Sequence, residues 1–119
     1  MDPRIKLALQ VLGKGAAEDL TVIHLAEEIG LSASRFEHML KRATGRTFRQ
    51  HRQSVRVRRA KTLLEDCRLS LKEIAYLSGY ASPSSFSRAF RTSVLRSPSE
   101  YRASLLDGTS DRLNAAGQV

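Results

Sequence analysis

Two stretches of the sequence place hydrogen-bond donors at spacings that suit a polyanion. From Arg35 to Lys61 there are ten Lys and Arg residues and a single acid, Glu37. From Ser82 to Arg91, serine hydroxyls and two arginines alternate with apolar positions. Guanidinium, ammonium and hydroxyl groups bind phosphate oxygens and base edges, so these stretches predict contact with DNA, RNA or an acidic membrane face.

Catalytic chemistry lacks a comparable pattern. His24, His38, His51 and Cys67 stand apart without metal-ligand spacing, and the sequence contains no Gly-rich phosphate loop and no Ser/His/Asp arrangement. We therefore expect no enzyme, no metal and no cofactor. The single cysteine excludes an internal disulfide and fits a reducing cytoplasm. No apolar run approaches the ~20 residues that cross a bilayer, so we expect a soluble, cytoplasmic protein. A basic helix that lies on a membrane needs bulky apolar residues on an exposed face, and the linker has too few of them, so we expect no membrane binding.

The bulk composition fits one small folded domain or two small lobes. The chain has 119 residues, of which 41% are apolar and 27% are charged, and these values are ordinary for a protein with a core. Twenty Lys and Arg against twelve Asp and Glu give a net charge of +8. A small protein that is this basic usually meets a polyanion.

Helix signals must position these donors, and they run along almost the whole chain. Apolar residues recur at helical spacing, caps such as Ser32 and Ser70 open the segments, and Gly45 or Gly79 ends them. We expect Ala43 to face inward on the third helix and Leu77 on the fifth. The pattern predicts seven helices and an all-α fold: 3–12, a helix between Thr21 and Gly30, 33–44, 47–66, a helix between Ser70 and Gly79, 83–93 and 98–106, with a frayed tail over 107–119.

One helical phrase occurs twice. "TVIHLAEEIGLSASRFEHMLKR", from Thr21, and "SLKEIAYLSGYASPSSFSRAFR", from Ser70, share a short helix, a Gly-containing turn and a second helix. Leu25, Ala26 and Gly30 correspond to Ile74, Ala75 and Gly79, and Phe36, Leu40, Arg46 and Thr47 correspond to Phe86, Phe90, Arg96 and Ser97. The small alanine permits a close helix crossing, and the glycine permits a left-handed turn. The repeat predicts two helix-turn-helix units.

This architecture predicts how the chain meets DNA. In a helix-turn-helix the second helix lies in the major groove, with its exposed residues toward bases and phosphates. We expect a first subdomain at 1–46, a linker helix at 47–66 and a second subdomain at 67–106. A linker of about 20 residues spans roughly 30 Å, close to the ~34 Å between successive major grooves on one face of B-DNA. One chain could then occupy two grooves as a monomer, either by bending the DNA or with one unit engaged weakly.

Nearly the whole chain resembles the DNA-binding domain of AraC/XylS-type bacterial transcription regulators. The residues that carry the resemblance are "IAYLSGYASPSSFSRAF" followed by "SPSEYR", together with "LAEEIGLSASRFEHMLKRATG" and "RVRRAKTLLED". The resemblance implies seven helices, two homeodomain-like lobes, binding to double-stranded promoter DNA, and regulation through contact with RNA polymerase. Most such regulators carry a further effector-binding or dimerising domain, so the native protein is expected to be either a single-domain regulator or a longer protein that could dimerise.

The candidate site residues follow from exposure on the second helices and from this resemblance. Base contacts are expected from Ser34, Glu37, His38, Pro83, Ser84, Ser87 and Arg88. Phosphate contacts are expected from Ser32, Arg35, Lys41, Arg46, Arg49, Ser82, Ser85 and Arg91.

Several of these assignments have alternatives. Arg88 either grips guanine or makes a simple phosphate contact, and Glu37 either accepts from cytosine or pairs with Lys41. Ser32 and Ser82 cap helices first and offer phosphate sites second. The chain also departs from the family pattern. Leu95 stands where Gly is usual, which predicts a different end for the sixth helix, and Arg52 stands where the linker is usually apolar.

A different class of function remains open from the sequence. The basic linker face could dock an acidic protein partner, with the repeats serving as a scaffold. A DNA-binding regulator is expected to prefer particular duplexes and to lose affinity as salt rises, whereas an interaction module is expected to capture a protein.

Overall fold

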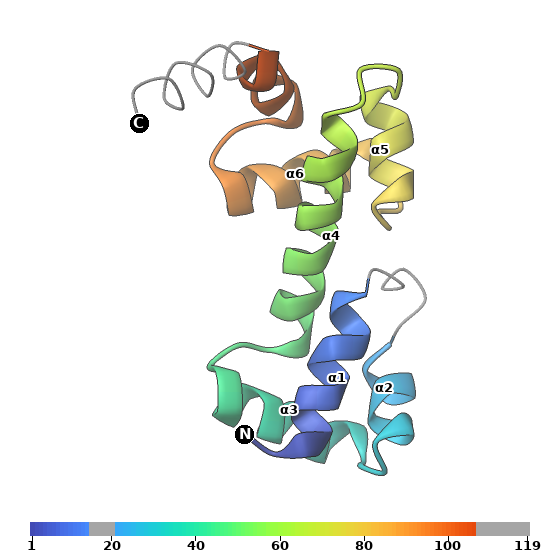
Figure 1. Cartoon of the computed structure of the whole chain (residues 1–119), viewed down its shortest axis with the longest axis vertical. Helices are drawn as coiled ribbons and strands as arrows, with labels where there is room; N and C mark the ends of the chain where they lie inside the picture. The colour runs from blue at the N-terminus through green and yellow to red at the C-terminus, as the bar shows by residue number, and fades with distance from the viewer. Residues whose placement is uncertain (15–20, 107–119) are drawn as a thin grey trace, which may run out of the picture. The chain divides into compact units, whose positions relative to one another are not determined.

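The computed structural model describes residues 1–14 and 21–106, and every regular element among them is a helix. The helices are α1 (Pro3–Gly13), α2 (Val22–Glu28), α3 (Ala33–Thr44), α4 (Phe48–Leu64), α5 (Leu71–Leu77) and α6 (Pro83–Val94), with a further helix over 98–106 (Figure 1). The predicted all-α fold with seven helices is confirmed. The expectation for the tail at 107–119 lies outside the described residues.

Side-chain caps set the starts of the helices. Thr21 Oγ1 accepts a hydrogen bond from the backbone N–H of His24 at 3.2 Å. Ser70 and Glu73 form a reciprocal capping box, in which each side chain accepts from the backbone N–H of the other residue. These bonds satisfy N–H groups that lack a partner within the helix, so the cap residues predicted from the sequence define where the helices begin.

The two Gly-containing turns have the same backbone geometry. Gly30 and Gly79 adopt φ values of 74° and 94°, in the left-handed region that favours glycine. The N–H of the following residue then bonds back to the buried alanine of the preceding helix, Leu31 to Ala26 at 2.9 Å and Tyr80 to Ala75 at 3.0 Å. The repeat in the sequence is therefore a repeat of structure.

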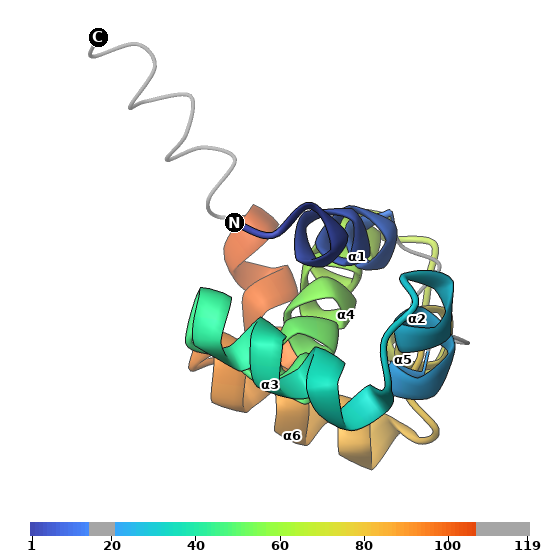
Figure 2. The ribbon, with the colours of Figure 1, turned by 90° about the horizontal axis from the view of Figure 1, so that it is seen from below.

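Contacts divide the chain into a first unit, Met1–Arg59, and a second unit, Ala60–Val119, with the division inside α4. In the first unit α3 crosses α1 and packs against α2 (Figure 2). Its core contains Ile5, Leu12, Leu25, Phe36, Leu40 and Phe48, and each of these side chains is at most 4% exposed. The rings of Phe36 and Phe48 meet edge to face, with centroids 6.1 Å apart.

The second unit is built on a run of aromatic contacts. Tyr80 packs on Phe86, Phe86 on Phe90, and Phe90 on Tyr101, with ring centroids 5.4 to 5.7 Å apart. Phe86 and Phe90 are almost fully buried, and the two tyrosines are half-buried. The second core therefore holds α6 against both α5 and the helix at 98–106.

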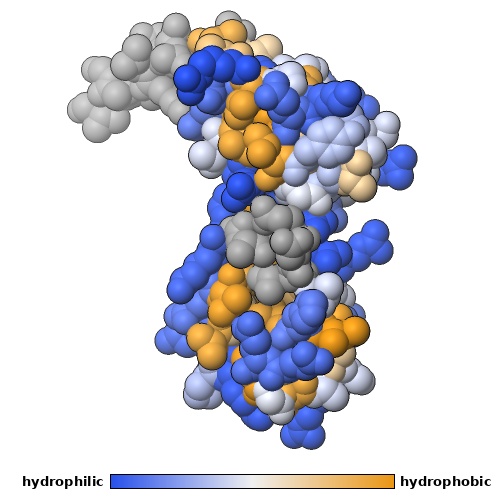
Figure 3. Space-filling model, turned by 90° about the vertical axis from the view of Figure 1, so that its right-hand side faces the viewer, coloured by the Kyte–Doolittle hydropathy of each residue, from blue (hydrophilic) through white to orange (hydrophobic). Residues whose placement is uncertain are grey.

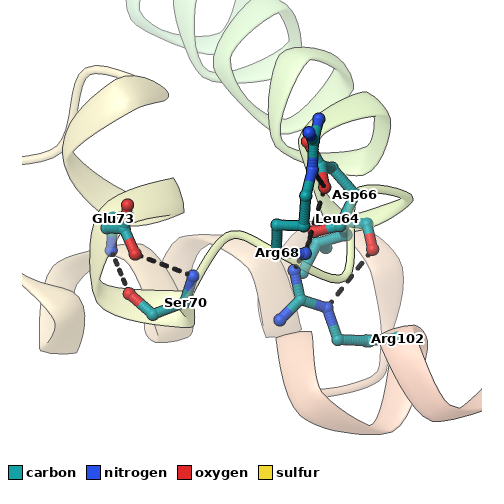
Figure 4. A network of polar contacts seen from close by, with 6 residues as sticks. All are labelled: Leu64, Asp66, Arg68, Ser70, Glu73 and Arg102. Carbon is teal, nitrogen blue, oxygen red and sulfur yellow. Dashed lines mark hydrogen bonds and ion pairs between the residues drawn. The ribbon is translucent and has the colours of Figure 1, made fainter.

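Arg102, in the helix at 98–106, closes the C-terminal end of α4. Its guanidinium donates to the carbonyl oxygens of Leu64, from Nε at 3.2 Å, and of Asp66, at 3.1 Å (Figure 4). Asp66 also accepts from Arg68, with its two carboxylate oxygens each 3.0 Å from a donor. Carbonyls at the end of a helix lack partners within that helix, so a cation placed there supplies both hydrogen bonds and favourable charge.

Two sequence expectations about helix faces and one about a helix end are wrong. Ala43 is exposed, because Thr44 instead turns inward and its Oγ1 donates to the carbonyl of Leu40 at 2.8 Å. Leu77 is 44% exposed and Ser78, the C-cap of α5, is 2% exposed, so the next residue faces the core. Leu95 does not change the end of α6, since it adopts φ 66° at the C-cap, close to the 76° of Gly45 at the end of α3.

Apolar side chains also reach the surface of each unit. Ile23 is 57% exposed in the first unit, and Tyr76 of α5 is 51% exposed in the second. Figure 3 shows hydrophobic surface in each unit bordered by hydrophilic surface. None of the helices in residues 1–14 and 21–106 combines the length and apolar character needed to cross a membrane.

Candidate nucleic-acid interface

Helix α3 presents a polar face opposite the core of the first unit. Ser32 caps it by accepting from the N–H of Arg35 at 3.1 Å, and the buried Phe36 and Leu40 fix its orientation. All the residues predicted to read or hold DNA from this helix are exposed, namely Ser34, Arg35, Glu37, His38 and Lys41. Since α3 is amphipathic in this way, its outward face is free to enter a groove.

Helix α6 repeats this arrangement in the second unit. Ser82 caps it, Pro83 occupies its first turn, and Phe86 and Phe90 face the core. The predicted site residues Pro83, Ser84, Ser87, Arg88 and Arg91 are all exposed. Ser85 is half-buried and its hydroxyl donates to the carbonyl of Ser82 at 2.9 Å, so its hydroxyl serves the cap.

The seven predicted base-contacting side chains share one further property. Among the described residues, none of them forms a hydrogen bond or an ion pair through its side chain: Ser34, Glu37, His38, Pro83, Ser84, Ser87 and Arg88. The alternative pairing of Glu37 with Lys41 is therefore not formed. Donors and acceptors without intramolecular partners can meet base edges without first losing a bond.

The basic side chains differ in how free they are. Arg35, Lys41 and Arg49 are exposed, and within the described part of the chain they make no ion pair. Arg46 lies back on α4, where one terminal nitrogen is 2.6 Å from Ser54 Oγ and 3.3 Å from the carbonyl of Gln50. Arg91 lies 3.8 Å from Glu100.

A surface hollow of about 430 Å³ gathers part of the first site. Glu37, His38 and Lys41 of α3 line it together with Arg42 and Thr47. The sequence analysis did not assign Arg42, although its place directly after Lys41 was a usable signal. The hollow therefore brings three predicted site residues together beside Thr47, which directly precedes α4.

Matching hydrogen bonds cap the N-terminal ends of the two helices that follow α3 and α6. Thr47 and Gln50 bond reciprocally at the start of α4, at 2.9 and 3.2 Å, and Ser97 and Glu100 do the same before 98–106, both at 3.1 Å. The hydrogen bonds from Ser97 lower the pKa of Glu100, so this carboxylate is ionised at neutral pH. One unit thus uses a neutral amide where the other uses a charge.

The surroundings of the two reading helices also differ in charge. Residues 33–50 contain five Lys and Arg and one acid, whereas residues 83–100 contain three Arg and one acid. The segment around α3 therefore carries a net charge of +4, and the segment around α6 a net charge of +2.

Arg52, singled out as a departure from the family pattern, packs within the first unit. Its guanidinium carbon lies 5.6 Å from the centre of the Phe48 ring, a cation–π arrangement. His51, its neighbour, lies 2.8 Å from Thr44 Oγ1, and burial together with the charge of Arg46 lowers the pKa of its imidazole. Both residues therefore brace the start of α4.

Comparison with known sequences points to one family. A family profile described as a helix-turn-helix domain matches residues 25–104. The Arabinose operon regulatory protein of Escherichia coli (strain K12) is 29% identical over 112 residues, which are 93% of this chain and 38% of that protein. The chain spans 7% to 38% of the length of the curated relatives it matches.

Solved structures agree with this assignment. The C-terminal domain of AraT, a response regulator from Geobacillus stearothermophilus, matches with a TM-score of 0.79 and 31% identity over 87% of this chain and 86% of that one. The DNA-binding domain of AdpA, solved in complex with a target DNA, matches with a TM-score of 0.76 and 29% identity over 87% and 93%. The fold of two helix-turn-helix units is thus shared with domains of this kind.

Proposed function

Because the chain belongs to the AraC/XylS-type family of helix-turn-helix transcription regulators, we propose that it binds promoter DNA sequence-specifically through α3 and α6. The family consists of DNA-binding regulators rather than enzymes. One observation carries the proposal for this chain. Each unit holds a helix whose phenylalanine face is buried while its opposite face offers donors and acceptors without intramolecular partners.

In the proposed complex, α3 and α6 enter successive major grooves of one duplex. Ser34, Glu37 and His38 would read bases from α3, and Pro83, Ser84, Ser87 and Arg88 would read them from α6. Ser32, Arg35, Lys41, Arg46, Arg49, Ser82, Ser85 and Arg91 would hold phosphates. The exposure of Arg35, Lys41 and Arg49 supports this role, whereas Arg46 would first have to leave Ser54.

The partners and the location of the protein follow as further parts of the proposal. We propose that the protein works in the bacterial cytoplasm and regulates transcription through contact with RNA polymerase. The chain is proposed to bind its site of roughly twenty base pairs as a monomer, and a longer native protein would allow a dimer.

Gel shifts across a genomic fragment library, repeated at several salt concentrations, test the proposal. We expect a subset of fragments to be retained and the affinity for them to fall steeply with salt, because bound cations release counterions from phosphates. If no duplex is preferred over bulk DNA and an acidic protein is captured instead, the protein-interaction module is the better description.

Two substitutions separate base reading from phosphate contact. Arg88→Ala is expected to relax sequence choice at one position by about 1–3 kcal/mol, because a bidentate Arg–guanine pair is lost. Arg49→Ala is expected to weaken all duplexes alike and to lower the salt slope by about 1. Binding to a panel of single-base operator variants measures both effects. If the two variants act uniformly, Arg88 is not a base reader.

A further inference from the structure

Gln50 and Glu100 occupy equivalent positions in the helices that follow α3 and α6, but only Glu100 carries a charge. Gln50 in the first unit and Glu100 in the second each accept a hydrogen bond from the N–H of a preceding hydroxyl residue, at 2.9 and 3.1 Å. The two side chains have the same length, and their capping geometry is equivalent. The capping role therefore needs an acceptor oxygen but no negative charge.

The charge of Glu100 faces a basic residue of the reading helix. Glu100 Oε1 lies 3.8 Å from the terminal nitrogen of Arg91, in the last turn of α6, and both side chains are well exposed, at 63% and 70%. In the first unit the residue that corresponds to Arg91 is Lys41, which makes no ion pair within the described part of the chain. Among the described residues, only the second site thus pairs an internal carboxylate with a proposed phosphate ligand.

We propose that Glu100 weakens the grip of the second unit on DNA by competing with a backbone phosphate for Arg91. The first unit then supplies the larger part of the electrostatic binding free energy. Helix α6 still discriminates between sequences, but the second unit binds DNA more weakly. This inference rests on the proposed DNA binding, and it adds that the two sites differ in how strongly they bind the DNA backbone.

The physical basis is an exchange of partners at one guanidinium. Arg91 must turn from a carboxylate to a phosphate, and the released carboxylate then stands near a polyanion of the same sign. Exposed ion pairs are weak and screened by salt, so the competition is modest. It acts only on the second site, where fewer cations are present to offset it.

The test is Glu100→Gln, which copies the residue that the first unit already uses. Operator affinity in low salt is expected to rise roughly two- to fivefold. The dependence of log affinity on log salt is expected to steepen by up to about 0.9, the value for one further phosphate contact. Thermal unfolding is expected to stay near that of the wild type, because the amide preserves the cap.

Glu73→Gln is the matched control. It removes the same charge from the other Ser/Glu capping box in the second unit, and among the described residues Glu73 forms no ion pair. We expect it to change DNA affinity much less than Glu100→Gln. Equal gains from both variants would show a general effect of net charge and would overturn the proposal.

A double-variant cycle decides whether Glu100 acts through Arg91. In an Arg91→Gln background, Glu100→Gln is expected to have little effect, since the contested cation is gone. If the gain persists there, or if Glu100→Gln weakens binding because the carboxylate orients Arg91, the inference is wrong. If the wild-type chain shows no preference for any duplex, the proposed function itself fails, which is a separate outcome.

Discussion

At the end of α3 the chain turns on a glycine, and at the corresponding place after α6 it turns on a leucine. The backbone takes the left-handed conformation at both, with φ 76° at Gly45 and 66° at Leu95. Each residue donates its N–H to a carbonyl one turn back, of Lys41 at 2.7 Å and of Arg91 at 2.8 Å. The two turns therefore share one backbone conformation and one hydrogen bond, although leucine disfavours that conformation.

The two units also brace the helix after this turn by different chemistry. In the first, Thr44 and His51 lie 2.8 Å apart in a polar contact. The corresponding residues of the second are Val94 and Tyr101, and Tyr101 packs on Phe90 instead. One backbone arrangement thus accepts either a hydrogen bond or an aromatic contact, provided that the buried surface is matched.

Position 52 of the first unit corresponds to position 102 of the second, and both hold arginine. Arg52 lies over the Phe48 ring, whereas Arg102 donates to the carbonyls of Leu64 and Asp66. The same residue type is therefore a surface brace in one unit and a helix-end clamp in the other.

The largest expected difference between the units is at this pair of arginines. Arg102→Ala should lower the free energy of unfolding by about 1.5–3 kcal/mol, because two carbonyls lose a charged donor. Arg52→Ala should cost only about 0.5–1 kcal/mol, a usual value for a cation–π contact that is not fully desolvated, since Arg52 is half-buried. Chemical denaturation of both variants measures the comparison. Equal losses would show that Arg102 does not act as a clamp.

A smaller effect is expected at the two left-handed turns. Leu95→Gly should stabilise the protein by about 0.5–1 kcal/mol, because relief of the left-handed strain exceeds the added freedom of glycine in the unfolded chain. Leu95 is 84% exposed, so little packing is lost. Gly45→Ala should destabilise by about 1 kcal/mol through backbone strain alone, since its Cβ would meet nothing within 4 Å.

Denaturation midpoints of these two variants, measured beside the wild type, test whether the turns are equivalent. If Leu95→Gly is destabilising, the leucine side chain makes a contribution that its exposure does not reveal. The comparison between the repeats would then fail at this position.

Much of the fold was predictable from local signals. The capping residues Ser32, Ser70 and Ser82 mark helix starts because their hydroxyls bond the next free backbone N–H groups. The repeat predicted the two crossed helix pairs, since Ala26 and Ala75 are both buried at the turn. These features depend on neighbours within a few residues, which a sequence shows directly.

The errors came from choices that depend on tertiary packing. Periodicity favoured Leu77 over Ser78 for the core, yet α5 ends at Leu77 and the serine is the residue that turns inward. Thr44 displaced Ala43 in the same way, because the start of α4 brings His51 to its hydroxyl. A hydrophobicity pattern does not predict the burial of a polar residue when that burial depends on contacts with another element of the fold.

The sequence predicted which faces of α3 and α6 are exposed, but it did not predict the side-chain contacts within the candidate site. The amphipathic pattern of α3 and α6 identified which side chains are exposed. The sequence did not predict that Arg46 bonds to Ser54 or that Glu100 lies beside Arg91. Such contacts join α6, or the turn after α3, to the helix that follows, and long side chains have many rotamers from which only the folded chain selects.

The smallest expected effect concerns pH and applies to the first unit only. Burial and the nearby Arg46 charge lower the pKa of His51 below its ordinary value of 6.5, so the unfolded chain binds this proton more readily than the folded one. Stability is then full above about pH 6.5 and is lost as the pH falls through the folded pKa.

Replacing Thr44 and His51 with Val and Tyr, the pair found in the second unit, should remove this pH dependence. Between pH 7 and pH 5 the free energy of unfolding should fall further in the wild type than in the double variant. The difference should be under about 1 kcal/mol, because the imidazole is partly solvated. Thermal unfolding across this range measures the difference. An unchanged slope in the double variant would place the titrating group elsewhere, and the polar and aromatic braces would then be equivalent in their response to acid.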